Sequence, residues 1–372
     1  NGVNSIDRLY RIYKVGDRKP SGNMNSETYT LYFCSEELLL SEQNKISKSF
    51  TGQKISSIVT NILTDKLNVD PQKIETIEET TGLYDFVIPN LKPFEAINWL
   101  STYAQPQGID APSADMLFFE TKEGYNFRSI QSMYKDDIYA TYKYAAKNLD
   151  DKDQDMQEKV TTVLEYEFTK TYDIMNEISS GSLANRLISI DPMTRSFNIT
   201  DFNIEDAKNK MQKLNPNDIV NDLTNRLGKP LNQAFEGVLK VVTGNANQGN
   251  LPYIKQKEGG FAKDINIETF VPMRTAAISL ANYTTIKLTI PGDPGITAGR
   301  TIQFNLFSLK PSNGKRELDR YYSGKYLVTA VRHMIEIPST YQTIIEIAKE
   351  SSATPIEQSD NSNSEVRQAV NT

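Results

Sequence analysis

The chain has 372 residues, of which 38% are hydrophobic and 24% are charged, and its formal net charge is -6. This length exceeds the size at which a single hydrophobic core usually stops growing, so we expect two or more domains. The acidic charge argues against a protein that grips the phosphate backbone of a nucleic acid, because that binding relies on clustered Lys and Arg.

Few residues in this sequence are suited to disulfide, metal or membrane roles. Cys34 is the single cysteine, which excludes an intrachain disulfide and a cysteine-based zinc site within one subunit. It ends the strand-like run 29–34, where we expect a small buried hydrophobe. No apolar stretch is long enough to cross a bilayer, and no signal peptide is recognisable. Because the chain begins at Asn1 without Met, we expect that part of the first domain precedes it.

The N-terminal segment is predicted to be a β-hairpin. Two aromatic and β-branched runs lie at 8–14 and 28–34, and the segment 15–22 between them is rich in turn residues. We therefore assign 1–48 to part of a first β-barrel.

The next segment, 49–145, is predicted to be a small α+β domain. Apolar residues recur at helical spacing from Ile55 to Leu67. A second helix is expected to begin at Pro93, because proline is tolerated in a first turn. A hairpin is expected over 116–130.

The segment 139–147 contains tyrosines and lysines that would suit binding to a nucleic acid by base stacking, but we favour a helix with these side chains on one face.

The charge run 148–155 that follows has too few apolar side chains to bury in a core. For 146–203 we expect a linker and the first strands of a second β-barrel. These strands are predicted at 164–168, where apolar and acidic residues alternate, and in two shorter runs, 187–190 and 196–200.

An insertion of helices and loops is predicted for 204–275. Apolar residues follow helical spacing over 204–239, whereas 243–260 is rich in Gly, Asn and Gln without periodicity. The rest of the second barrel is expected at 276–350, where four strands alternate with turns. The polar tail 351–372 is expected to be disordered unless a partner orders it.

A search for catalytic chemistry assigns no catalytic, cofactor-binding or metal-binding residue. His333 is the only histidine, and its place inside a strand favours a structural role. The glycines at 259–260 and 292–295 do not match a phosphate-binding loop and are interpreted as turns. Paired carboxylates such as Glu78-Glu79 and Asp136-Asp137 are interpreted as solvated surface, although a glycosidase would need only two acids across a cleft.

Three C-terminal segments carry a resemblance to a known family: Thr289–Ile302 with its Pro291-Gly292-Asp293-Pro294-Gly295 turn, Ser323–His333, and Tyr341–Glu346. Together they resemble the second barrel of baseplate hub subunits of contractile-tailed bacteriophages and of the related spike proteins of type VI secretion. The segment Val87–Leu100 is similar, more loosely, to the helical segment that follows the first barrel of those hubs. The candidate site residues are the structural turns of this barrel, namely Gly292, Pro294, Gly295, Gly299 and Gly324.

The resemblance implies a mainly β fold with α+β insertions, built from two tube-like β-barrels of which the first is incomplete here. It also implies a non-enzymatic homotrimer without a cofactor, whose ring joins a sixfold tail tube to a threefold central spike. Other baseplate proteins would be further partners, DNA would pass through the channel without specific binding, and no membrane insertion is expected. Such a protein is made in the host cytoplasm and ends in the tail baseplate of the virion. The insertion 204–260 has no counterpart in this pattern.

Two alternatives stay open. A tail-associated enzyme that degrades the cell wall would use two carboxylates that the sequence does not single out. A carbohydrate-binding receptor module would expose aromatic side chains on one face and form no trimeric channel.

Overall fold

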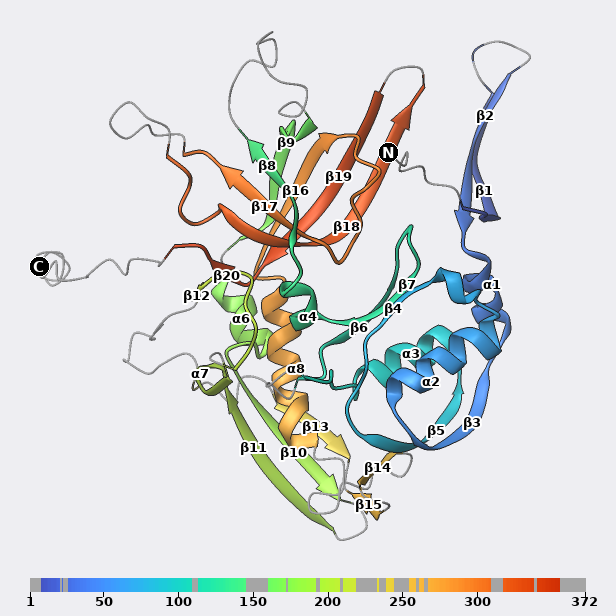
Figure 1. Cartoon of the computed structure of the whole chain (residues 1–372), viewed down its shortest axis with the longest axis vertical. Coiled ribbons are helices and arrows are strands. Elements are labelled where there is room, and N and C mark those ends of the chain that lie inside the picture. Colours follow the sequence, from blue (N-terminus) through green and yellow to red (C-terminus); the bar gives the residue numbers. More distant parts are fainter. Residues whose placement is uncertain are drawn as a thin grey trace, which may run out of the picture.

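The computed structural model describes residues 8–20, 22, 26–108, 113–144, 160–171, 173–191, 195–207, 210–218, 233, 239–243, 254–258, 261–263, 267–308, 317–337 and 340–354. Within them the chain is mainly β with α+β parts, which confirms the predicted fold class (Figure 1). In the described part of the chain, no helix is both long and apolar enough to span a membrane.

The largest element is a six-stranded sheet, here called the curled sheet. Its strands, in spatial order, are β8 (Ile138–Tyr144), β17 (Thr301–Leu306), β18 (Gly324–Glu336), β19 (Thr340–Lys349), β16 (Thr284–Pro291) and β9 (Glu165–Lys170). All neighbours are antiparallel except β8 and β17. The predicted alternation is confirmed in β16, where Ile286, Leu288 and Ile290 are fully buried and Lys287 is exposed.

The two edges of the curled sheet approach each other. The backbone N–H of Lys143 in β8 donates to the carbonyl of Thr161, and that of Val163 donates back to Lys143, at 3.0 and 2.9 Å. The rings of Tyr144 in β8 and Tyr166 in β9 lie 4.6 Å apart. The space inside is filled by side chains such as Phe304, so the interior of this half-barrel is a packed core.

The α+β part contains two small sheets and the helices that cover them. Its helical elements are α1 (Glu36–Gln43), α2 (Ile55–Asn61), the π-helical turn η1 (Ile62–Lys66), the 3-10 turn η2 (Pro71–Lys73), α3 (Pro93–Ser101) and α4 (Ile130–Tyr134). Its strands are β3 (Ile46–Gln53), β4 (Ile74–Ile77), β5 (Leu83–Leu91), β6 (Met116–Glu120) and β7 (Tyr125–Ser129). The helices predicted at 55–67 and from Pro93 are confirmed, and so is the hairpin over 116–130.

The predicted N-terminal hairpin is confirmed as a ribbon of two antiparallel strands, β1 (Arg11–Pro20) and β2 (Glu27–Cys34). Among the described residues this ribbon has no third strand, so it does not form a barrel there. In Figure 1 it stands to one side of the curled sheet.

A separate three-stranded sheet packs against α8 (Ile267–Ala281), the longest helix among the described residues. It contains β10 (Ala184–Asp191), β11 (Ser196–Asn203) and β13 (Leu239–Thr243), and α6 (Ile174–Ser180) and α7 (Ile204–Ala207) lie beside it. The runs 187–190 and 196–200 are expected in the second barrel, but they pair with each other in this separate sheet. The cause is α8, because alternate residues of β10 such as Leu187 and Ser189 are buried against it.

Two further expectations need correction. The segment 139–147 is expected to be helical, but 138–144 is strand β8, held by pairing with β17. The segment 243–260 is expected to be a loop, but β14 (Ile254–Glu258) pairs with β5 and with β15 (Phe261–Lys263). In each case pairing or packing with distant residues decides the conformation.

Parts of the other predictions fall outside the described residues. Of 204–239, only α7 is an α-helix among the described residues, and most of 208–238 is not described. At the C-terminus, β20 (Ser351–Ser352) pairs with β12 (Asn217–Asp218), whereas the tail from 355 lies outside the description. The domain boundaries stay predictions. We note that β8 falls in the segment 49–145 and β9 in the segment 146–203, and that both strands belong to the curled sheet.

Candidate functional site

The turn after β16 contains three of the candidate residues. Gly292 donates its N–H to the carbonyl of Tyr341 at 3.0 Å, which places the turn directly against the Tyr341 ring. A side chain on Gly292 would overlap that ring, so glycine is required by the close approach. The next residue, Asp293, donates its N–H to Thr343 Oγ1 at 3.0 Å. The turn is therefore fixed on β19.

The carboxylate of Asp293 is the centre of a polar cluster. It accepts hydrogen bonds from the hydroxyls of Tyr142 and Tyr139, at 3.0 and 3.1 Å, and from the N–H of Gly295 at 2.8 Å. Burial, with the nearby Asp293 charge, raises the pKa of Tyr139 to about 12. The same causes raise the pKa of Tyr142 further. Both tyrosines therefore stay protonated donors, and they tie β8 to the turn.

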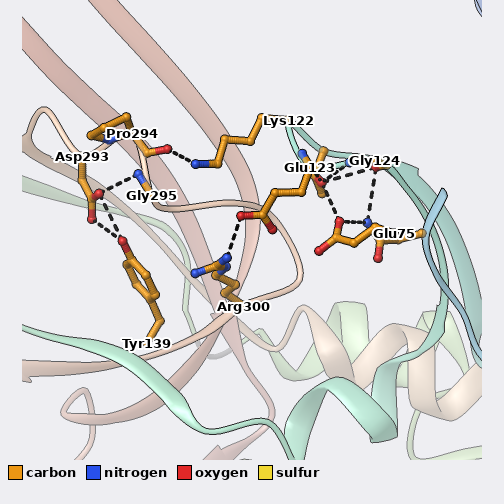
Figure 2. A network of polar contacts seen from close by, with 11 residues as sticks. Glu75, Lys122, Glu123, Gly124, Tyr139, Asp293, Pro294, Gly295 and Arg300 are labelled. Carbon is orange, nitrogen blue, oxygen red and sulfur yellow. Dashed lines mark hydrogen bonds and ion pairs between the residues drawn. The ribbon is translucent and has the colours of Figure 1, made fainter. Parts of the chain in front are cut away.

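The turn also contacts the β6–β7 hairpin of the α+β part, as Figure 2 shows. The ammonium of Lys122 donates to the carbonyl of Pro294. The neighbouring Glu123 forms an ion pair with Arg300 at 2.8 Å, and the Arg300 guanidinium lies 4.8 Å from the centre of the Tyr139 ring. These contacts join two parts of the fold that are about 170 residues apart in the sequence.

The tip of the β6–β7 hairpin is itself held by the strand beside it. Glu75 of β4 accepts hydrogen bonds from Asn126 at 2.6 Å and from Thr121 at 2.9 Å. Gly124 has a positive φ of 158° and packs so closely against the backbone of Lys73 and Glu75 that a side chain would collide there. The hairpin therefore presents Lys122 and Glu123 from a fixed position.

The two remaining candidate glycines lie at other contacts of the curled sheet. Gly299 has a φ of 86°, and a side chain there would lie 2.9 Å from the ring of Phe119 in β6. Gly324 begins β18, where Asn215 bonds both the N–H and the carbonyl of Lys325, at 2.9 and 3.0 Å. The structure thus brings Gly292, Pro294 and Gly295 together in one turn and places Gly299 and Gly324 at other contacts.

A cleft of about 540 Å³ lies beside the contact between the turn after β16 and the β6–β7 hairpin, which we call the joint. The hairpin residues Phe119 and Lys122 form one wall, and the β18 residues Ala330 and His333 form the other. The His333 Nδ1 lies 3.2 Å from the Tyr341 hydroxyl and 3.3 Å from Thr343 Oγ1. Burial and the charge of Lys122 lower the pKa of His333, so its ring is neutral at neutral pH.

The other residues singled out in the sequence have structural partners. Glu78 accepts from Ser129 N–H and from the Ser132 hydroxyl, at 2.8 and 2.7 Å. Asp136 forms a bidentate pair with Arg128. Cys34 is half-buried at the end of β2 rather than fully buried as expected. Within the described ranges, no group of three His, Cys, Asp or Glu side chains is arranged to hold a metal ion.

Sequence reasoning missed the roles of Asp293, Tyr139 and Tyr142. The signal was present in 138–144, where apolar and aromatic residues alternate with Thr141 and Lys143 as in a strand. A register shift in the β8–β17 pairing, after Ile138, lets Tyr139 and Tyr142 both reach Asp293. Strand alternation alone would place these two side chains on opposite faces.

No family model matches the sequence, and no curated protein matches it. Among solved structures, the chain is similar to the tail protein from Neisseria meningitidis MC58, with a TM-score of 0.50 and 9% identity over 90% of this chain and 79% of that chain. It is also similar to the 43 kDa tail protein of prophage MuSo2 from Shewanella oneidensis, with a TM-score of 0.47 and 8% identity over 90% and 78% of the two chains. At 9% identity, the likeness to the Neisseria protein shows a shared fold.

Proposed function

We propose that this chain is a non-enzymatic structural subunit of a phage tail and that it forms the baseplate hub. Three copies assemble into a ring that joins the sixfold tail tube to the threefold central spike. The observation that carries this proposal is the fold, shared over 90% of the chain with a protein described as a tail protein. The resemblance of the three C-terminal segments to hub subunits supports the same role.

We place the proposed channel outside the curled sheet, because this sheet is packed with side chains. The interior of the sheet is filled by buried side chains, including Ile302, Phe304 and Tyr326, and leaves no passage for DNA. In a hub, the channel therefore runs between subunits, along their outer surfaces. The net charge of -6 opposes condensation of DNA on such a wall, which lets DNA slide past without binding.

The joint around Asp293 gives the subunit a mechanical property that suits a ring under load. One hydrogen bond and one ion pair from the β6–β7 hairpin connect the curled sheet to the α+β part. A satisfied polar network of this kind holds the two parts in one arrangement, which is what a subunit of a tail needs.

The test is the mass of the purified protein by light scattering, followed by electron microscopy of the same sample. A trimer with a central channel is expected. A stable monomer, both alone and in a mixture with its tube and spike partners, would overturn the hub. Release of soluble fragments from peptidoglycan by the purified protein would favour the enzyme instead, and specific glycan binding by a monomer would favour the receptor module.

A further inference from the structure

The strand β18 has an edge that is paired only at its start. On one side, β19 pairs with it from Leu327 to Glu336. On the other side, β17 pairs with it only from Gly324 to Leu327, and the loop at Gly299 and Arg300 then bonds Val328. Beyond this point no described strand pairs with that side of β18. An edge of this kind presents a row of backbone N–H and C=O groups to an added strand.

This free edge, 329–336, runs along the cleft beside the joint. Thr329, Ala330, Val331 and His333 line the cleft, which measures about 540 Å³. A strand laid in the cleft would therefore meet unpaired backbone groups on one side and the β6 wall, with Phe119, on the other.

The same chain carries a strand pair that lacks a partner. In the β1–β2 ribbon, Ile12 lies opposite Phe33 and Val15 lies opposite Leu31, which places these four side chains on one face. Ile12, Val15 and Phe33 are 54%, 59% and 53% exposed. An isolated two-stranded hairpin is only marginally stable in water, so we expect another protein surface to pack against this face and the outer edges of the ribbon.

The opposite net charges of the ribbon and of the rest of the chain favour a second copy of this chain as the partner that packs against the ribbon. Residues 8–34 contain five Lys and Arg and two Asp and Glu, a net charge of +3. The rest of the chain therefore carries -9, since the total is -6. The ribbon is attracted to the body of another copy. In its own chain the strands β1 and β2 stand apart from β18 (Figure 1), and the preceding residues Arg8 and Tyr10 lie at the cleft, where Arg8 pairs with Glu120 and Tyr10 lines the wall.

We propose that the β1–β2 ribbon of one copy adds to the free β18 edge, 329–336, of the next copy. The two surfaces differ, so the contact is heterologous and repeats head to tail until a ring closes. Each copy then covers its apolar ribbon face and loses one open edge. This inference rests on the proposed function in that it requires copies of the chain to associate.

The test uses two single-cysteine proteins in a Cys34→Ser background. One carries Thr30→Cys on the ribbon, and the other carries Ala330→Cys on the free edge; both residues are exposed. The two proteins are mixed and treated with a bismaleimide that has a flexible spacer. The spacer can join the two cysteines whichever ribbon residue lies opposite Ala330. A covalent dimer is expected in the mixture at least tenfold above the level given by a Met175→Cys control, whose residue on α6 is 75% exposed.

A second variant tests the apolar face. Ile12→Ser with Phe33→Ser, added to the Thr30→Cys protein, is expected to reduce the cross-linked dimer at least tenfold while the circular dichroism spectrum stays unchanged. A trimeric ring without the cross-link would overturn this inference and leave the proposed hub intact. A protein that gives no cross-link and stays monomeric, both alone and in a mixture with its tube and spike partners, would overturn both.

Discussion

The hydroxyl of Tyr142 lies 3.0 Å from a carboxylate oxygen of Asp293 and joins an edge strand of the curled sheet to the turn that follows β16. Tyr139 donates to the same carboxylate, which also orders its own turn through Gly295. One acidic side chain therefore connects β8 to the turn after β16 at the place where the curled sheet meets the β6–β7 hairpin.

Removal of this carboxylate is expected to cost more than removal of one donor. Asp293→Ala leaves two tyrosine hydroxyls and one N–H without an acceptor, so we expect a loss of about 2–3 kcal/mol in the free energy of unfolding. Tyr142→Phe removes one hydrogen bond and is expected to cost about 1 kcal/mol. Urea unfolding followed by tyrosine fluorescence measures both, with Tyr29→Phe on the exposed ribbon as the control. Equal losses for the two variants would contradict a central role for Asp293.

Gly292 is expected to tolerate no side chain. Because a methyl group there would overlap the Tyr341 ring, Gly292→Ala should lower the free energy of unfolding by about 1–3 kcal/mol. Gly22→Ala is the matched control, since nothing lies within 4 Å of the added methyl. In the double variant with Tyr341→Ala, the second change should cost less than it does alone. Simple additivity of the two losses would rule out the overlap as the cause.

The contact between Tyr144 and Tyr166 is expected to hold the two edges of the curled sheet together. Their rings lie 4.6 Å apart in a T-shaped arrangement. A double-mutant cycle with Tyr144→Ala and Tyr166→Ala should give a coupling energy of about 0.5–1.5 kcal/mol. The same cycle with Tyr144→Ala and Tyr29→Ala should give none, because Tyr29 lies on the ribbon. A coupling near zero in the first cycle would show that the edges are held by the backbone alone.

Asp115 is expected to make stability depend on pH. Burial raises the pKa of Asp115 to about 6, and hydrogen bonds from Ser129 and Gln131 offset this only in part. The neighbouring charged and titratable groups are Arg274 and Tyr134. Since the folded pKa lies above the ordinary value of 3.8, the stability from the neutral carboxyl is present at low pH and is lost as the pH rises through 6.

Asp115→Asn keeps a neutral polar group in the same place and removes this titration. Relative to the unmodified chain, the variant should gain about 1 kcal/mol between about pH 5 and about pH 8. Thermal unfolding at the two pH values measures the gain. Buried Glu350, whose pKa burial also raises, is left unchanged and contributes the pH dependence that remains. A constant difference between the two proteins across this range would contradict a raised pKa for Asp115.

Short sequence patterns correctly predicted those helices and strands whose conformation depends mainly on residues close by in the sequence. Pro93 marked the start of α3 because a proline needs no N–H partner in a first turn. The alternation of Ile286, Leu288 and Ile290 predicted a strand with one buried face. The prediction of a helix for 139–147 was wrong because tyrosine and lysine suit either a helix face or a strand. Pairing with β17 stabilises the strand.

The sequence by itself determined the acidic charge, the scarcity of residues for metal or disulfide chemistry, and the strand-rich C-terminal third, because composition and alternation do not depend on distant contacts. Only the tertiary structure decided that Asp293 binds Tyr139 and Tyr142, that Lys122 meets Pro294, and that no described strand pairs with one side of β18 beyond Val328. These features join residues more than a hundred positions apart or depend on where a neighbouring strand ends. Such long-range relationships have no local signal, since sheet pairing selects them from many possible partners.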